Sequence, residues 1–296
     1  MKLMSKRFSL RKILFSIILV SFAGSSLSIA ESGELGTLYK KSWDEHFFYQ
    51  NNNNEIKNAY FLFFDLFSTN SFTKNDIRAF ELYSINENGE DFFVLTEREG
   101  NREGRGFYII RKDPTARNLL MIPHRRYDKY TGEIGLKIFL NSNLKCIAWN
   151  TTSRFGSEDH LQDLAKVEES VFNAFAEAFV KVNPNQFVFQ LHGYSVEKRK
   201  TESGSNSECI LSNGTRHLTR PLETLSEALK QVMGYHTKVY PEEVSELGAT
   251  TNITGKRLRD IGFYGFVHIE LNFDIRKRLN RSPEELLLFS KCIMSL

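Results

Sequence analysis

The residues best suited to chemistry lie in one short stretch, residues 119–133. The apolar run Leu119–Ile122 predicts a buried strand. His124 and Asp128 follow it, ahead of a helix predicted at Thr131–Leu140. In α/β proteins, catalytic side chains gather where the chain leaves the carboxyl end of a strand. This stretch is therefore the first candidate for a functional site.

A second histidine ends a comparable strand. The apolar run at residues 186–191 leads directly into His192, so two rigid strands can aim imidazoles at one ion. Zinc in hydrolases takes three ligands from imidazole and carboxylate groups and keeps one position for water. We expect Zn²⁺ to be held by His124, His192 and Asp128. Glu133, in the first turn of the predicted helix, is the alternative carboxylate.

Glu270 is the expected general acid and base. It lies in the apolar strand predicted at residues 265–271, where an unpaired carboxylate is costly unless it faces a polar site. A carboxylate beside a metal can accept a proton from water and later return it to the leaving group. The two-residue repeat of a strand places His268 on the same face. His268 could therefore orient Glu270 or contact the substrate.

Arg126 and Arg154 are the expected contacts for an anionic substrate. A guanidinium group binds a carboxylate through two parallel hydrogen bonds, which suits arginine to this task. We therefore expect a small-molecule or peptide-like substrate that carries negative charge.

The order of the predicted elements indicates an α/β fold with a mixed, mostly parallel sheet sandwiched by helices. A hairpin comes first, and strands then alternate with helices, as in parallel strands joined by right-handed crossovers. Such crossovers bring His124, Asn150, Arg154 and His192 to one edge of the sheet. The expected strands are residues 91–97, 106–111, 119–122, 145–149, 186–191 and 265–271, and the expected helices are 131–140, 158–181 with Ser157 as its cap, 222–233 and one that begins at Ser282.

Other segments have less regular patterns. Residues 31–56 contain few aliphatic residues and are expected to form a loosely ordered lead-in. Residues 58–84 are rich in aromatic residues and are expected to pack as helix against the main body. Residues 195–221 are polar and are expected to form a long surface loop near the site.

The N-terminus has the pattern of a cleavable secretory signal. Basic residues precede an apolar run from Ile13 to Ala23, and Ser28-Ile-Ala30 provides a cleavage site near Ala30. The apolar run is shorter than the ~20 residues of a membrane span, so no stable span is expected after cleavage. We expect a secreted or periplasmic protein with residues 1–30 as signal, 31–89 as an N-terminal segment and 90–296 as the catalytic domain.

Charge and cysteine content narrow the function further. The first 30 residues hold five basic and no acidic residues, so removing them leaves 34 basic against 36 acidic residues. Without an excess of positive charge or an extended basic stripe, a nucleic-acid partner is not expected. Three cysteines, Cys146, Cys209 and Cys292, lack metal-ligand spacing. Cys209 is the best candidate for a disulfide, with no partner assigned.

Three motifs together resemble the zinc carboxypeptidase-like superfamily, and more closely its N-formylglutamate amidohydrolase and poly-γ-glutamate hydrolase branches. They are Pro123-His124 with Asp128, Thr131 and Glu133 after it, the strand end Leu191-His192-Gly193, and the late strand Gly265–Glu270. The resemblance covers roughly residues 90–296. It implies a mixed sheet between helices, as in zinc peptidases and phosphorylase/hydrolase-like folds.

The resemblance also implies roles for single residues. It implies zinc at His124, Asp128 and His192, catalysis by Glu270, and a substrate pair for which Asn150 and Arg154 are the nearest match. The family's His-x-x-Glu spacing is not kept, because Tyr127 occupies the third position after the first histidine.

Motifs and resemblance lead to the same expectation of function. We expect an exported zinc-dependent hydrolase that cleaves an amide bond in a peptide-like substrate, an acylated amino acid or a poly-glutamate chain. The alternative is a secreted binding or host-interaction protein that keeps the fold with a degenerate site.

Overall fold

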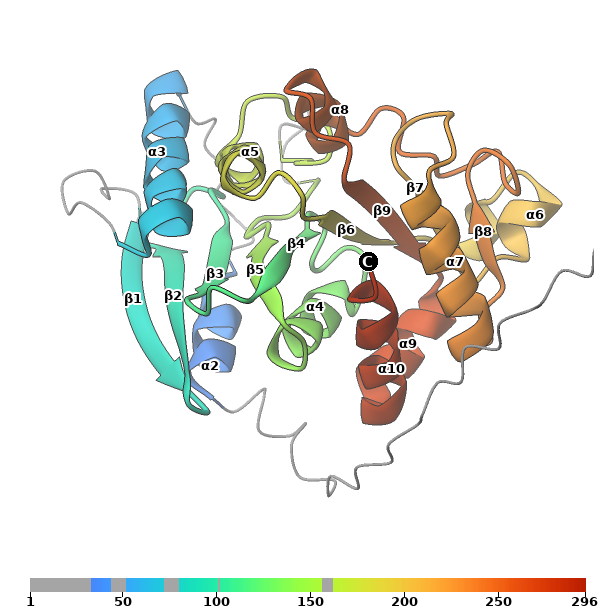
Figure 1. Cartoon of the computed structure of the whole chain (residues 1–296), viewed down its shortest axis with the longest axis horizontal. Coiled ribbons are helices and arrows are strands. Elements are labelled where there is room, and N and C mark those ends of the chain that lie inside the picture. The colour runs from blue at the N-terminus through green and yellow to red at the C-terminus, as the bar shows by residue number, and fades with distance from the viewer. Residues whose placement is uncertain (1–32, 44–51, 72–79, 101, 156–161) are drawn as a thin grey trace, which may run out of the picture.

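The computed structural model describes residues 33–43, 52–71, 80–100, 102–155 and 162–296. Its strands are β1 Phe80–Glu87, β2 Glu90–Glu97, β3 Phe107–Arg111, β4 Arg117–Ile122, β5 Leu144–Trp149, β6 Val188–Gly193, β7 Cys209–Ser212, β8 Thr237–Val239 and β9 Phe266–Leu271. Within these residues they form one sheet with the order β1-β2-β3-β5-β4-β6-β9-β7-β8 (Figure 1). The central strands β5, β4, β6 and β9 run parallel, and antiparallel pairs flank them.

Helices cover both faces of the sheet. One face packs against α3 Asn53–Thr69, α5 Val171–Val182 and α8 Ile253–Asp260. The other packs against α2 Glu34–Lys41, α4 Thr131–Leu140, α7 Arg220–Val232, α9 Phe273–Arg281 and α10 Pro283–Ile293. The short helices η1 Val196–Lys198 and α6 Glu202–Ser205 lie between β6 and β7 in the chain. The expected α/β fold, a mixed sheet sandwiched by helices, is confirmed.

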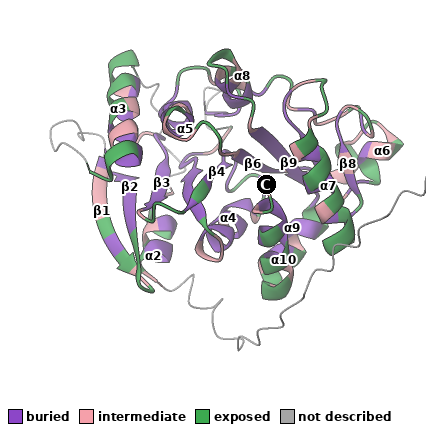
Figure 2. Cartoon of the chain, viewed as in Figure 1, coloured by how far each residue is buried: buried purple, intermediate pink, exposed green. Residues whose placement is uncertain are grey.

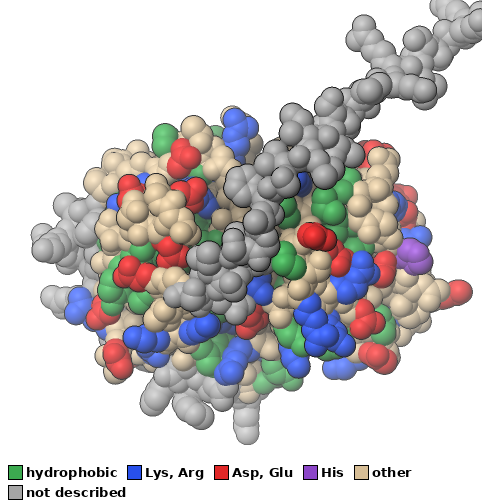
Figure 3. Space-filling view, turned by 90° about the horizontal axis from the view of Figure 1, so that it is seen from below, with side chains coloured by type: hydrophobic (Ala, Val, Ile, Leu, Met, Phe, Trp, Pro, Cys, Tyr) green, Lys and Arg blue, Asp and Glu red, His purple; other side chains and the backbone are tan. Residues whose placement is uncertain are grey.

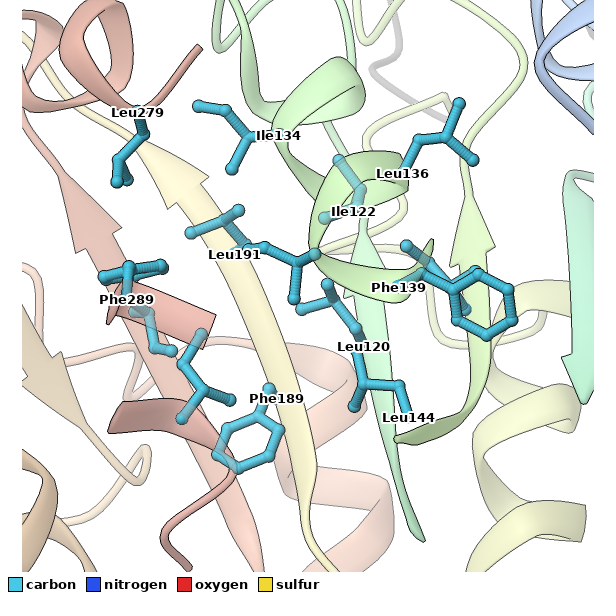
Figure 4. Packing of buried hydrophobic residues seen from close by; sticks show 14 of the residues in the cluster. Leu120, Ile122, Ile134, Leu136, Phe139, Leu144, Phe189, Leu191, Leu279 and Phe289 are labelled. Atoms are coloured by element: carbon cyan, nitrogen blue, oxygen red, sulfur yellow. The ribbon is translucent and has the colours of Figure 1, made fainter. Parts of the chain in front are cut away.

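The parallel strands are buried on both sides, as Figure 2 shows for the centre of the sheet. Leu120 and Ile122 of β4 pack beneath Ile134 and Phe139 of α4, with Leu191 of β6 beside them (Figure 4). Burying each such side chain stabilises the fold by about 1.5 to 3 kcal/mol. Because these strands are covered on both faces, the side chains on both faces are expected to be apolar. A polar residue at the end of such a strand therefore stands out.

Several predicted elements are confirmed. Helix α4 spans the predicted residues 131–140, and β2 and β3 form the predicted antiparallel hairpin. Helix α10 begins after Ser282, whose side chain accepts a hydrogen bond from the backbone N–H of Glu285. Strand β8 and helix α9, which lie between predicted elements in the chain, were not expected.

The prediction of a loosely ordered segment at residues 31–56 is wrong for helix α2. Leu35 and Tyr39, one helical turn apart, are both buried against the sheet. The backbone N–H of Leu35 donates to Oε2 of Glu87 at 2.9 Å, which fixes the start of the helix. Tertiary contacts stabilise a helix too short to be marked by its sequence alone.

The prediction of helix over residues 58–84 is correct for α3 but wrong for β1. Strand β1 pairs antiparallel with β2 through the turn Asn88-Gly89, where both residues have positive φ. An Asn-Gly pair between two apolar runs is a strong hairpin signal, because both positions of this turn favour φ above zero. Residues 72–79 lie outside the described part.

The predicted helix at 158–181 begins much later, at Val171. Ser170 is its cap: the side-chain oxygen accepts a hydrogen bond from the backbone N–H of Asn173 at 3.2 Å. The predicted cap, Ser157, lies outside the described residues. Residues 162–169 are not helical, and Gln162 and Asp163 bond Asn150 and His124, which follow the carboxyl ends of β5 and β4.

The predicted surface loop at 195–221 contains a buried strand, β7, which pairs with β9 and β8. Cys209 begins this strand and is a free, buried thiol, as are Cys146 and Cys292. The disulfide expected at Cys209 is therefore wrong. Burial of the run Cys209–Leu211 within the sheet outweighs the polar composition around it.

The N-terminal predictions concern residues that the structure does not describe. The signal sequence, residues 1–30, lies outside the described part. Among the described helices, none has both the length and the apolar character needed to cross a membrane. The boundary predicted at residue 89/90 falls inside the hairpin between β1 and β2, so the sheet is continuous across it.

The surface seen from below carries both signs of charge. Lys/Arg and Asp/Glu side chains are interspersed on this face (Figure 3). No stripe of one sign runs across the part of this face that belongs to described residues, which agrees with the charge balance of the sequence.

We expect Ser170→Ala to destabilise the protein by about 1 kcal/mol, because the first turn of α5 loses its side-chain cap. The matched control is Thr219→Ala, since Thr219 precedes α7 without capping it through its side chain. Urea denaturation followed by circular dichroism measures both. Equal stabilities of the two variants would contradict the assignment of the cap.

Candidate metal-binding active site

The register of two parallel strands brings four polar side chains together. In the pairing of β6 with β9, His192 lies opposite Glu270 and Gln190 lies opposite His268. Because side chains two residues apart share a face, all four project to the same side of the sheet. All four are buried, with at most 8 % of any residue exposed.

His124 and Asp128 join them from the loop after β4. A turn closes this loop, in which the backbone N–H of Asp128 donates to the carbonyl of His124 at 2.9 Å. Asp128 Oδ2 then lies 3.3 Å from Nδ1 of His124 and 3.5 Å from Nδ1 of His192. The two Nδ1 atoms are 3.1 Å apart. Three potential ligand atoms thus form a nearly equilateral triangle.

The other ring nitrogen of His124 is bonded to Asp163. Nε2 lies 2.8 Å from Oδ1 of Asp163, and the second oxygen of Asp163 accepts from Arg154 at 2.7 Å. Burial raises the pKa of Asp163, but the contacts with His124 and Arg154 outweigh it and lower the pKa to about 2. The ionised carboxylate can only accept, so Nε2 of His124 carries the proton.

The other ring nitrogen of His192 is bonded to an amide oxygen. Nε2 lies 2.9 Å from Oε1 of Gln190, which also accepts from Nδ2 of Asn252 at 2.5 Å. The amide nitrogen of Gln190 donates to the hydroxyl of Thr254 at 3.3 Å. With its oxygen turned to the histidine, Gln190 can only accept from it, so Nε2 of His192 carries the proton.

The orientation of Gln190 is fixed by a chain that ends at the backbone. The hydroxyl of Thr254 donates to Oδ1 of Asn173 at 2.8 Å, and Nδ2 of Asn173 donates to the carbonyls of Val167 and Glu168. Backbone carbonyls only accept, so each group in the chain has one role. The amide of Gln190 therefore cannot be reversed without breaking the chain.

Both imidazoles thus present the lone pair of Nδ1 to the triangle, where Oδ2 of Asp128 is a third acceptor. Zinc ligands at bond lengths of about 2.0 to 2.1 Å and tetrahedral angles lie about 3.3 Å apart. The observed distances of 3.1, 3.3 and 3.5 Å fit this spacing. The set of His124, Asp128 and His192 therefore fits a metal ion.

Arg154 also points to this triangle. Its Nη1 lies 3.1 Å from Nδ1 of His124, and because guanidinium only donates, Nδ1 must be the acceptor. A metal would need the same lone pair, so Arg154 would release His124 while keeping its bond to Asp163. The contact supports the tautomer of His124 and places a positive charge beside the site.

The pKa values of the three side chains shift because they are buried and lie close to one another. Burial opposes charge on His124, but its contacts with Asp128 and Asp163 outweigh this and raise its pKa. Burial and the neighbouring His124 lower the pKa of His192. Burial acts against the charge of Asp128, yet the two histidines hold its pKa well below the usual range.

Glu270 and His268 complete the site. Oε2 of Glu270 and Nδ1 of His268 are buried without a hydrogen-bond partner, and Oε1 of Glu270 lies 3.8 Å from Nε2 of His268. Burial, together with the charge of Asp128, raises the pKa of Glu270 to about 8. Burial also lowers the pKa of His268. A second possible ligand group, His192, His268 and Glu270, shares one histidine with the first.

A cavity of about 650 Å³ opens onto these side chains. The rings of Tyr127 and Phe155 lie against each other at its rim, with centroids 4.3 Å apart and ring planes tilted by 59°, and both side chains are exposed. The positive side chains of the lining outnumber the two carboxylates: Arg154, Lys166, Lys198, Arg199 and Arg276 against Asp128 and Glu270. The cavity therefore favours an anionic molecule.

The structure brings together His124, Asp128, His192, Glu270, His268 and Arg154. Arg126 does not line the cavity, and its guanidinium lies 5.1 Å from the ring of Trp43. Asn150 is fully buried outside the cavity, where its side chain bonds Thr152 and the carbonyl of Gln162. Glu133 lies near Tyr39 and Arg125 instead of the histidines.

Asn150 and Arg126 are therefore placed differently from the expectation. Asn150 directly follows β5, and its side chain accepts hydrogen bonds from the backbone N–H and hydroxyl of Thr152, which stabilises the turn after the strand. Arg126 neighbours the site in sequence, but consecutive residues of the tight turn point in different directions. The carboxylate beside the two imidazoles is Asp128.

The sequence analysis did not predict a role for several residues of the site. Gln190 had a signal, because it lies two residues before His192 in a predicted strand and so shares its face. No sequence pattern marked Asp163. The residues around it were predicted to be helical, whereas helix α5 begins only at Val171, eight residues after Asp163. Asn252 and Thr254 are at the start of α8, far from the predicted motifs.

The chain is similar in part to solved structures of low sequence identity. No family model matches the chain, and no curated protein matches it. The chain is similar to N-formylglutamate amidohydrolase from Ralstonia eutropha JMP134 over 65% of its length and 97% of that protein, with 10% identity and a TM-score of 0.43. It is similar to a bacteriophage poly-gamma-glutamate hydrolase over 61% and 83%, with 12% identity and a TM-score of 0.37. Function is therefore inferred from the side chains of the site.

We expect Gln190→Leu to weaken zinc binding about 10- to 100-fold, because Nε2 of His192 loses its acceptor and the ring its fixed orientation. The matched control is Gln186→Leu, since Gln186 accepts a hydrogen bond from the backbone of Asn118, at the opposite end of the sheet. Competition with a fluorescent zinc chelator measures both affinities. An unchanged affinity in Gln190→Leu would contradict the role of the amide chain.

Proposed function

We propose that this protein is a zinc-dependent hydrolase that cleaves an amide bond in an anionic, peptide-like substrate. One observation carries the proposal: three acceptor atoms of His124, His192 and Asp128 converge at the spacing of zinc ligands. An unpartnered carboxylate oxygen of Glu270 lies in the same buried site. A metal ion and a neighbouring carboxylate are the two components of metal-dependent amide hydrolysis.

His124, His192 and Asp128 would hold the ion, and a cavity-facing position would stay open. Zinc in this position supplies Lewis acidity and activates water for attack at neutral pH. The hydrogen bonds of Asp163 and Gln190 keep both imidazoles in the ligating tautomer.

Glu270 is proposed to move the proton. Positive charge in the triangle favours its ionised form, which accepts a proton from the attacking water. The protonated carboxyl then donates to the amine that leaves. Its burial keeps bulk water away from the exchanged proton, and His268 on the same strand face limits its orientation.

The cationic lining is proposed to bind the substrate. Arg154 is bonded to Asp163 and lies over the rings of Tyr127 and Phe155, so its guanidinium is held at the mouth of the cavity. Lys198 and Arg199 line the cavity as well. These charges favour an acylated acidic amino acid or a γ-glutamyl chain over a neutral amide.

We also propose that the protein is exported to the periplasm or beyond the cell. The support for this is the basic, apolar and small-residue pattern of residues 1–30.

Glu270→Gln is expected to lower amide hydrolysis by about 10²- to 10⁴-fold while zinc stays bound, because only the proton acceptor is lost. The matched control is Glu133→Gln, which removes a carboxylate that lies away from the histidines. Zinc content is measured by elemental analysis, and hydrolysis is measured on N-formyl- and N-acetyl-glutamate, γ-glutamyl oligomers and neutral acyl amino acids.

The outcomes separate the candidate functions. Full activity in Glu270→Gln would contradict the role of the glutamate. Stoichiometric zinc in the wild type with no hydrolysis of any of these amides would favour the binding-protein alternative. No zinc in the wild type, or unchanged zinc content in His192→Ala, would contradict the metal site.

A further inference from the structure

Arg276 of helix α9 reaches the site at a point where three backbone segments meet. The residue is 5 % exposed, and its guanidinium lines the cavity. Four of its hydrogen bonds go to backbone carbonyl oxygens. A buried arginine usually pairs with a carboxylate, so this set of partners calls for an explanation.

The four bonds divide among the three segments. Nη1 donates to the carbonyl of Lys129 at 2.7 Å, and Nη2 donates to the carbonyl of Tyr194 at 3.2 Å. Nε donates to the carbonyls of Leu271 and Asn272 at 3.2 and 3.3 Å. These segments lie at or after the carboxyl ends of β4, β6 and β9, and the planar guanidinium of Arg276 bonds all three.

Each segment begins beside a side chain of the site. The acceptor in the first segment directly follows Asp128. The acceptor in the second lies two residues after His192, and the third segment begins directly after Glu270. The bonds therefore hold the backbone where the chain leaves the strands, next to two proposed metal ligands and the proposed proton acceptor.

Gly193 makes room for this arrangement. A Cβ atom at position 193 would overlap the guanidinium of Arg276. The N–H of Gly193 also donates to Oδ2 of Asp128 at 2.9 Å, so the backbone here touches both the arginine and a ligand atom. Glycine allows the guanidinium to lie flat against the chain immediately after His192.

The charge of Arg276 is compatible with the site. Burial lowers its pKa, and the negative charges of Asp128 and Glu270 oppose that shift. Lysine could not replace it, because one ammonium group cannot reach three diverging segments, whereas guanidinium has five donors in a fixed plane.

We propose that Arg276 is a positioning residue that sets the distances between Asp128, His192 and Glu270 by bonding the backbone beside each of them. The inference rests on the proposed metal site, whose geometry the arginine would fix. Loss of the fork would let the three segments move apart and would change both the affinity for a metal and its coordination geometry.

The chain offers a matched control in Arg111. It is 2 % exposed and donates to backbone carbonyls of Phe139, Ser142 and Leu144, and it also pairs with Glu90. These contacts lie at the amino end of β5, the opposite edge of the parallel strands from the site. Arg111 is thus buried and bonded to backbone carbonyls as Arg276 is, but it lies away from the proposed metal site.

The test uses Co²⁺ as a spectroscopic probe in the full protein. Arg276→Lys and Arg276→Met are compared with Arg111→Lys and Arg111→Met for the Tm of the metal-free protein, the Kd for Co²⁺ and the visible spectrum of the Co²⁺ form. We expect the Arg276 variants to bind Co²⁺ about 10- to 100-fold more weakly, with an altered spectrum. The Arg111 variants should lower Tm and keep the Kd and spectrum of the wild type.

Gly193→Ala is a further variant. It leaves Arg276 in the sequence, but the added Cβ atom would push the guanidinium out of its position. If Arg276→Met does not fold, Arg276→Lys and Gly193→Ala still decide, and both are expected to alter the Co²⁺ spectrum. Wild-type spectrum and affinity in the Arg276 variants, or equal losses in the Arg111 variants, would overturn the inference alone. A wild type that takes up no Co²⁺ would overturn the proposed metal site, and the inference with it.

Discussion

Three electron-pair acceptors face one another across at most 3.5 Å with no proton assigned between them. They are Nδ1 of His124, Nδ1 of His192 and Oδ2 of Asp128. Their repulsion inside a buried site is costly unless a cation lies among them. The guanidinium of Arg154, whose Nη1 lies 3.1 Å from Nδ1 of His124, supplies part of that charge. The surrounding structure can be understood as what holds these acceptors together against this repulsion.

The sheet and the loops share that task. Buried parallel strands place His192 and Glu270 in register, and apolar packing on both faces prevents the strands from sliding. Outside the strands, hydrogen bonds decide the details. Asp163 and Gln190 fix which nitrogen of each imidazole faces the centre. The chain of hydrogen bonds that begins at Gln190 ends at the backbone carbonyls of Val167 and Glu168, which ties the site to the fold.

How much could be predicted from the sequence depended on how local the cause was. His124 and His192 stand out because polar residues at the ends of buried strands are rare, and a wholly local pattern marked α4. The role of Asp163 could not be predicted, because it lies in a segment that was predicted to be helical but is not. In the structure this segment brings Asp163 to Nε2 of His124. Asn150 directly follows β5, but its side chain bonds Thr152 and the carbonyl of Gln162, and these partners depend on the turn after the strand. Contacts between segments that are distant in the chain leave no local pattern in a single sequence.

The triangle of acceptors formed by His124, His192 and Asp128 is proposed to bind one metal ion. Crystals of the zinc-loaded protein, measured on both sides of the zinc absorption edge, test it most directly. We expect a single anomalous difference peak bonded to Nδ1 of His124, Nδ1 of His192 and a carboxylate oxygen of Asp128, with Glu270 beside it and not bonded. No peak there, or a peak bonded instead to His268 and Glu270, would contradict the account.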